Sequence, residues 1–333
     1  IMGAGAFIMA QWTGISYLKI IAVATIPAIM YFVSVAYFVH IEALKHGIAP
    51  TPKKDLPRLG AVLKEGIHFT IPVILLVFLL VRGFTPTYAA CIGIVGVIVV
   101  SWFKKNTRMG IRDILDALYM GARNTLSTAA ILKCVGIVIG VVAITGVAIT
   151  FSGVVMELSG GILFIAIILV MLASLVLGMG LPVTASYIML AVLAGPALVQ
   201  MGVSLLAAHM IIFWYSQDAN VTPPVCLAAF SAAGVAGSKP MKTGFTSWKL
   251  AKGLYIIPFL FAYTPILFEG PVIEVIITAL SALIGLFGFT VTWEGFILRK
   301  MYILERVVVG LGTIFLFWPD DLVKLLGLII MMG

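Results

Sequence analysis

Long runs of apolar residues, separated by short basic segments, dominate this sequence. Hydrophobic residues make up 62% of the chain and charged residues 10%, against about 45 to 50% and about 25% in soluble domains. A helix needs about 20 apolar residues to cross a bilayer. The runs predict spans at 20–40, 67–82, 87–103, 126–150, 204–236 (interrupted), 254–268, 272–290, 306–318 and 322–333.

The continuous Leu-, Ile- and Val-rich runs indicate helices, because a transmembrane barrel needs short alternating segments. The predicted fold class is therefore an all-α polytopic membrane protein. No Ser/His/Asp set, paired carboxylates or phosphate loop stands out, so we expect no enzyme. His40, Glu42 and His46 do not share one helical face, and the cysteines have no metal spacing, so we expect no transition metal. The net charge of +8 is scattered over loops, which argues against a nucleic-acid partner.

The basic loops predict the orientation of the chain in the membrane. With one crossing per span, four loops lie on the same face, and they carry Lys45, Lys53, Lys54, Arg58, Lys64, Lys104, Lys105, Arg108, Arg112, Lys239, Lys242, Lys249, Lys252, Arg299, Lys300 and Arg306. The intervening loops carry acidic residues, namely Glu157, Glu269, Asp320 and Asp321. By the positive-inside rule the basic face is cytoplasmic. The amphipathic stretches 107–126 and 241–253 are either interfacial helices or ordinary basic connectors.

One stretch, GMGLPVTASY (178–187), interrupts an apolar region with two glycines, a proline and two hydroxyl groups. The arms on either side, 162–177 and 184–199, have 16 residues each, or roughly 24 Å, which is short of a hydrocarbon core of about 30 Å. This length favours a re-entrant hairpin over two crossings. The stretch is either a tight turn packed in protein or one wall of a site.

A second interruption, WYSQDANVTPP (214–224), combines polar residues with adjacent prolines. The prolines remove two backbone donors, so the helix must open and leave carbonyl groups free. Oxygen groups beside freed carbonyls suit a hard cation, and Asp218 is an ionisable residue within a membrane segment. A proline kink whose polar residues satisfy their neighbours is the alternative.

Two facing breaks would form one site for an anion and a cation. A helix N-terminus offers N–H groups to an anion, and the C-terminal end of the preceding arm offers carbonyls to a cation. A faint repeat also aligns GAFIMAQWTGIS (5–16) with AAFSAAGVAGSK (228–239), matching Phe7 with Phe230, Ala10 with Ala233, Gly14 with Gly237 and, after a length difference, Pro27 with Pro258. Inverted repeats of this kind build many secondary transporters.

The segments LGMGLPVTASYIMLAVLAGPAL and FWYSQDANVTPPVCLAAFSAAGVAGSKPMKTG resemble the large (DctM-like) membrane subunit of tripartite ATP-independent periplasmic (TRAP) transporters. The resemblance covers roughly residues 1–268 and is closest to fused forms that work with TAXI-type solute-binding proteins. It implies an elevator-type, sodium-coupled importer of small organic anions in the bacterial inner membrane. It also implies an extracytoplasmic binding protein and a small four-helix membrane domain or subunit, fused upstream, as partners.

The resemblance further implies a division of the chain and a set of site residues. Residues 1–19 would end a truncated first-repeat helix, 20–125 form scaffold-type spans, 126–253 the transport region with hairpin 162–199 and broken helix 204–236, 254–268 the last core span and 272–333 an extension. The first hairpin would be missing. The expected substrate-binding residues are Gly178, Gly180, Pro182, Thr184, Ser186, Thr222 and Pro223. The expected sodium-binding residues are Gly178, Met179, Thr184, Asp218, Asn220, Val221 and Thr222.

The polar SQDAN segment departs from the family pattern, so the ion ligands stay open. A proton-coupled anion transporter and a non-transporting scaffold subunit are the alternatives.

Overall fold

The computed structural model describes residues 4–49 and 66–332, with residues 52, 56, 58 and 60 between them. Every regular element in these residues is a helix, and the one β-bridge among them joins Phe296 to Lys300. This confirms the predicted all-α class. The chain divides into two compact units, Ile1–Ile48 with Cys134–Gly333 and Ala49–Lys133.

The smaller unit contains a helical hairpin. Its elements are η2 (Ile67–Phe69), α4 (Thr70–Val81), α5 (Pro86–Ser101), η3 (Lys105–Thr107) and the first part of α6 (Ile111–Thr145). Helices α4 and α5 pack on each other, and Gly96 allows their close approach, since a Cβ there would lie 3.2 Å from Leu75. Lys53, Lys54 and Lys64, three of the predicted cytoplasmic charges, lie outside the described residues.

The larger unit contains the remaining helices. They are α1 (Ala4–Thr13), α2 (Tyr17–Lys45), α7 (Val147–Leu158), α8 (Leu163–Leu177), α9 (Val183–Gln200), α10 (Leu205–Tyr215), α11 (Asp218–Val221), α12 (Leu227–Ala236), α13 (Pro240–Leu250), α14 (Gly253–Tyr263), η4 (Pro265–Leu267), α15 (Val272–Glu294), α16 (Ile303–Leu316) and α17 (Asp321–Met332).

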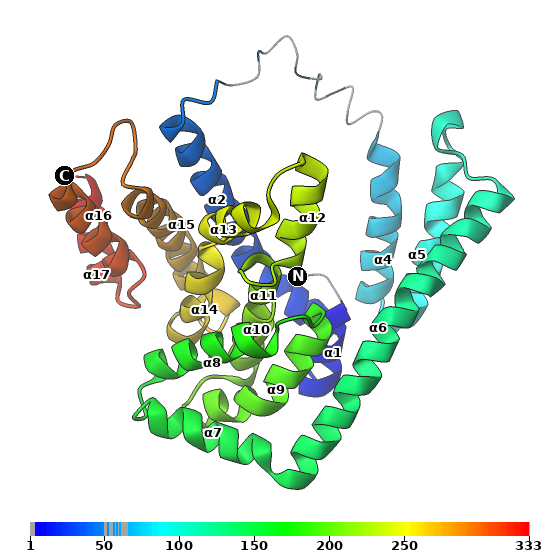
Figure 1. Ribbon diagram of the computed structural model, residues 1–333, viewed down its shortest axis with the longest axis horizontal. Helices are drawn as coiled ribbons and strands as arrows, with labels where there is room; N and C mark the ends of the chain where they lie inside the picture. The colour runs from blue at the N-terminus through cyan, green and yellow to red at the C-terminus, as the bar shows by residue number, and fades with distance from the viewer. Residues whose placement is uncertain are drawn as a thin grey trace. The chain divides into compact units, whose positions relative to one another are not determined.

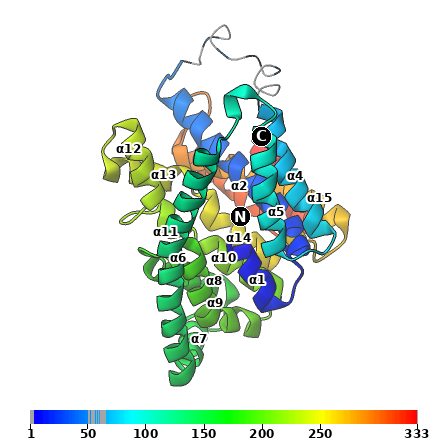
Figure 2. The same cartoon turned by 90° about the vertical axis from the view of Figure 1, so that its right-hand side faces the viewer.

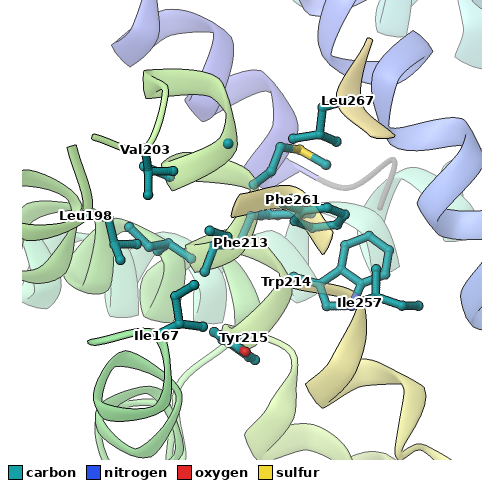
Figure 3. Close-up of a cluster of buried hydrophobic side chains, with 14 of the residues drawn as sticks. Ile167, Leu198, Val203, Phe213, Trp214, Tyr215, Ile257, Phe261 and Leu267 are labelled. Carbon is teal, nitrogen blue, oxygen red and sulfur yellow. The ribbon is translucent and has the colours of Figure 1, made fainter. Parts of the chain in front are cut away.

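Helix α10 forms the centre of the hydrophobic core. Its residues from Leu206 to Tyr215 are all buried, and Trp214 makes an edge-on ring contact with Phe261 at 5.4 Å. Figure 3 shows its last turn among side chains of α8, α9 and α14, namely Ile167, Leu198, Ile257 and Phe261. Because protein surrounds α10 up to Tyr215, the break that follows this residue begins within the core.

Helix α6 differs from the sequence prediction. The sequence predicts a span at 126–150 and, at 107–126, either an interfacial helix or a basic connector, but one helix runs from Ile111 to Thr145. No proline interrupts this stretch, so the amphipathic segment continues into the apolar one. The helix ends at Gly146, whose φ of 71° is left-handed, and α7 leaves at an angle of 75° (Figure 1).

Three described helices are long and apolar enough to cross a membrane, namely α2, α9 and α15. A fourth crossing is reached if the bent pair formed by the end of α6 and α7 counts as one span. The shorter apolar helices include α4, α5, α8 and α12. Helix α9 has 18 residues, or about 27 Å, so its length comes close to a full crossing.

The faint sequence repeat corresponds to matching helices. Helices α1 and α12 both have ten residues, and each is followed by a left-handed glycine, Gly14 or Gly237. The N–H group of Gly14 donates to Ala10 O, and that of Gly237 donates to Ala233 O. Figures 1 and 2 show α1 next to α2, and these two helices pack on each other.

The bend after α6 yields a test of glycine conformation. A Cβ at Gly146 or at Gly153 would meet nothing within 4 Å, so neither substitution is hindered by packing. Gly146→Ala forces a left-handed alanine and should destabilise the fold by roughly 1–2 kcal/mol. Gly153→Ala, inside α7, should stabilise it by up to about 1 kcal/mol. Thermal unfolding of both purified variants in detergent measures the difference, and equal midpoints would contradict the left-handed bend.

Candidate functional site

The first break is the turn between α8 and α9. Helix α8 ends at Leu177, and the N–H group of Gly178 still donates to Ser174 O at 2.8 Å. Gly180 then has a left-handed φ of 78°, and Pro182 is the N-cap residue of α9. The first N–H groups of a helix have no partner within it. The hairpin predicted at 162–199 therefore presents a helix N-terminus at its tip.

The second break lies between α10 and α12. Helix α10 ends at Tyr215, and α11 adds only the four residues Asp218–Val221. The chain then passes through Pro223 and Pro224, joined by a cis peptide bond, before α12 begins. The predicted interruption of the helix at 204–236 is thus present. It places Asp218 and Asn220 of the SQDAN segment on a short helical turn, with Ser216 and Gln217 in the link before it.

The two breaks contact each other through Gly178. A Cβ on this glycine would lie 3.2 Å from Ala219 Cβ in α11, 3.1 Å from Ser186 Oγ in α9 and 2.7 Å from Ser174 O in α8. Contacts below 3.0 Å to a backbone oxygen leave no room for a methyl group. Glycine is therefore required here to hold the hairpin tip against the broken helix.

Asp218 is the buried charge at this junction. Its side chain is fully buried, and among the described residues its one hydrogen-bond partner is the Ser174 hydroxyl, 3.4 Å from Oδ2. That hydroxyl also lies 2.6 Å from Met171 O, and a hydroxyl donates only one hydrogen. Within the described residues Asp218 has no ion pair with a lysine, arginine or histidine. A carboxylate held in this way needs a cation or a proton, because an uncompensated buried charge is strongly unfavourable.

Two oxygen atoms at the junction have no hydrogen-bond partner in the part of the chain that the structure describes. They are Asp218 Oδ1 and Ser186 Oγ, and both residues are fully buried. Ser186 lies one turn into α9, and Gly178 adjoins its hydroxyl. Unpaired buried oxygens are rare in native proteins and call for an explanation. An oxygen-liganded cation such as sodium fits this donor set.

Tyrosines surround the carboxylate. Asp218 is close enough to act electrostatically on Tyr31, Tyr215 and Tyr255. The Tyr255 hydroxyl is hydrogen-bonded to Thr222 Oγ1, and the Tyr215 hydroxyl donates to Tyr255 O at 3.3 Å. These two contacts tie the end of α10 and the C-cap of α11 to α14 through neutral groups.

A cavity of about 670 Å³ adjoins α11. It is lined by Ile21, Ala24, Thr25, Ala28, Ile29, Tyr31, Phe32, Val183, Phe213, Trp214, Gln217, Asn220, Val221, Ala228 and Leu254. The lining combines apolar and aromatic side chains with a few neutral polar groups and contains no charged residue. This composition is typical of sites for small molecules. The cavity meets the first residue of α9, where the hairpin tip begins its second arm.

The structure brings together some of the predicted site residues and separates others. Gly178, Ser186 and Asp218 gather at the junction, while Asn220 and Val221 line the cavity. Thr184 and Pro182 are half-buried near the tip. The remaining predicted residues have other surroundings: Met179 and Gly180 are exposed, Thr222 is hydrogen-bonded to Tyr255, and Pro223 lies near Gly244.

Sequence reasoning missed Ser174, Tyr31, Thr25 and Tyr255. Ser174 lies four residues before Gly178, one helical turn away, which is a signal that spacing could have given. The other three come from α2 and α14, far along the chain, and nothing local marks them.

The fold and the paired breaks define a multi-pass membrane protein with discontinuous helices, the arrangement found in secondary transporters. Residues 1–269 match the family described as tripartite ATP-independent periplasmic transporter, DctM component. The chain therefore belongs to the DctM family and is the large membrane component of a TRAP transporter. Members of this family are transporters that work with a periplasmic solute-binding protein and a small membrane subunit. No curated protein and no solved structure matches the chain.

Disturbing the contact at Gly178 should make position 219 in α11 more accessible to reagents. Gly178→Ala pushes the hairpin tip away from α11, so a cysteine placed at Ala219, which is 7% exposed, should react faster with a membrane-permeant maleimide. The experiment is done with the exposed native Cys91 and Cys134 replaced by serine.

Gly153→Ala is the matched control, since a methyl group there meets nothing within 4 Å. We expect at least a severalfold faster reaction with Gly178→Ala and no change with the control. Equal rates in both backgrounds would show that the breaks do not need this contact.

Proposed function

We propose that this chain is the permease subunit of a sodium-coupled importer of small organic anions, working by an elevator movement. A TAXI-type extracytoplasmic protein delivers the solute, and a small four-helix membrane domain, fused upstream, completes the transporter. The protein lies in the inner membrane with its basic loops in the cytoplasm. The observation that carries the proposal is the pair of unpartnered buried oxygens, Asp218 Oδ1 and Ser186 Oγ, where the two breaks meet.

The donor set supports sodium as the coupling ion. Hard cations bind oxygen atoms and need compensation for the water that they lose. The junction offers one carboxylate and one hydroxyl without other partners, beside helix ends whose carbonyls are free. The negative charge of Asp218 offsets the charge of the ion. A bound cation in turn neutralises the Asp218 carboxylate, which has no basic partner among the described residues.

The cavity supports an organic anion as the solute. Its aromatic and aliphatic wall suits a carbon skeleton, and Gln217, Asn220 and Thr25 supply neutral hydrogen-bonding groups. Val183, the first residue of α9, also lines it, so the solute lies beside a helix N-terminus that favours negative charge. A carboxylate bound there would lie near the bound cation, which links the binding of both.

The sodium site is tested by removing one oxygen. Ser186→Ala should raise the sodium concentration for half-maximal uptake about tenfold, equivalent to about 1.4 kcal/mol, because one ligand is lost. Uptake is measured in proteoliposomes that contain the complete transporter with its solute-binding protein.

Ser152→Ala is the matched control for that test. Ser152 is also buried, but its hydroxyl is already bound to Leu193 O at 3.0 Å. We expect the control to keep the parent's sodium dependence. An unchanged sodium dependence in Ser186→Ala would remove this hydroxyl from the site.

Proton coupling is the second candidate, favoured by the absence of any basic partner for Asp218 among the described residues. A protonated Asp218 would be neutral without a bound ion. An inward proton gradient without sodium then drives uptake in the parent. Asp218→Asn, which mimics the protonated acid, keeps solute exchange but loses gradient-driven accumulation.

Sodium coupling predicts a different pattern for the same variant. Under sodium coupling, a proton gradient alone drives nothing, and Asp218→Asn weakens the dependence of uptake on sodium. The two coupling ions predict opposite results for uptake driven by a proton gradient without sodium. This measurement on the parent and on Asp218→Asn therefore decides between them.

A further inference from the structure

Glu294, the last residue of α15, is a buried carboxylate outside the residues that match the family. The match ends at residue 269, and α15 begins at Val272. The Glu294 side chain is 1% exposed, and its Oε2 atom lies 3.0 Å from Lys45 Nζ and 2.9 Å from Lys249 Nζ. One carboxylate from the C-terminal extension thus forms ion pairs with a lysine of α2 and a lysine of α13.

A second contact lies beside this ion pair. The ammonium group of Lys252 is 3.8 Å from the ring centroid of Trp248 in α13 and 4.1 Å from that of Trp293 in α15. Cation–π contacts gain strength when they are shielded from water, and Lys252 is 6% exposed. Trp293 and Glu294, adjacent residues of α15, therefore hold Lys252 and Lys249.

These two lysines flank the joint between α13 and α14. Helix α13 ends at Leu250, its C-cap is Ala251, and α14 begins at Gly253. In the matching first repeat, α2 runs without a break from Tyr17 to Lys45. The joint is thus a break specific to the second repeat, and a break between helices is where a chain can bend.

Helix α15 is itself fixed along α2. Ring pairs join the two helices, Tyr37 with Phe287 at 5.2 Å and Phe38 with Phe289 at 6.1 Å between centroids. Phe38 is fully buried. The extension is therefore anchored to α2 over several turns before it reaches the joint.

Ion pairs of Lys249 hold the end of α13 against α2 and α15. Burial lowers the pKa of Lys249, but its hydrogen bonds and charge interactions with Glu42 and Glu294 outweigh this and raise the pKa above its ordinary value. Lys249 therefore stays charged at neutral pH. Without the charge of Glu294, Lys45 and Lys249 would each lose a partner at about 3 Å, and Lys249 would keep only Glu42.

We propose that the end of α15 is a clamp on the joint between α13 and α14, with Glu294 as its positioning residue. The clamp holds α13 against α2 while the broken segment α10–α12 moves during transport. The clamp follows from the contacts of Trp293 and Glu294 alone. Only its effect on uptake rests on the proposed transport function.

Distances between spin labels test the clamp without any solute. Labels are attached to cysteines at His40 in α2 and Phe245 in α13, both exposed, in the complete transporter lacking Cys91 and Cys134. Glu294→Gln keeps the volume of the side chain and removes its charge. The parent should give one narrow distance distribution, and Glu294→Gln a broader and longer one.

Glu305→Gln is the matched control. Glu305 also belongs to the extension and pairs with Arg299 at 2.6 Å. Its partners among the described residues, Arg299 and Tyr302, lie in neither α2 nor α13. The control should keep the narrow distribution. Should Glu294→Gln fail to fold, Trp293→Leu takes its place, because it removes the cation–π contact and leaves both ion pairs, and it too should broaden the distribution. A narrow distribution in the folded clamp variant overturns the proposal.

Uptake separates failure of the clamp from failure of the transport proposal. The clamp predicts that Glu294→Gln lowers the maximal uptake rate severalfold and leaves the half-saturating sodium concentration unchanged, since the ion site is elsewhere. Equal maximal rates in Glu294→Gln and Glu305→Gln contradict the proposed effect of the clamp on uptake. Absence of sodium-driven uptake in the parent contradicts the proposed function, while the distance measurement still decides on the clamp.

Discussion

The contact of Gly178 with Ala219 is the constraint on which the site depends. It brings two helix breaks, far apart in the chain, within van der Waals distance at a place where α10 is surrounded by core side chains. Each break leaves backbone groups that a bilayer cannot satisfy. Placing them together within protein makes both tolerable, and it gathers Ser174, Ser186 and Asp218 around one point.

In the proposed mechanism, the same contact links ion and solute. Helix α11 carries Asp218 at the junction, and its residues Asn220 and Val221 line the cavity. A cation bound on one side of this single turn would therefore act on a solute held on the other side. Coupled transport requires such reciprocal linkage between two sites, and a four-residue helix joins them over the shortest path.

Much of the arrangement could be predicted from the sequence, and the reasons are local. Glycines with Pro182 mark the tip of the hairpin, and Pro223 with Pro224 mark the break, so α8, α9 and α10 begin and end close to the predicted residues. The bend at Gly146 was not predicted, because a glycine inside an apolar run does not show the sign of its φ. The pairing of Thr222 with Tyr255, and of Glu294 with Lys249, depends on packing between distant helices, which a single sequence does not encode in any local pattern.

The sodium site can be tested by equilibrium binding of radioactive sodium to the purified transporter, with potassium as competitor. The measurement needs no knowledge of the solute. A site at the junction predicts saturable binding that potassium does not displace and that is lost when Ser186→Ala and Asp218→Asn are combined. Binding of equal affinity in the folded double variant, or no binding in the folded parent, would contradict a sodium site at the junction of the two breaks.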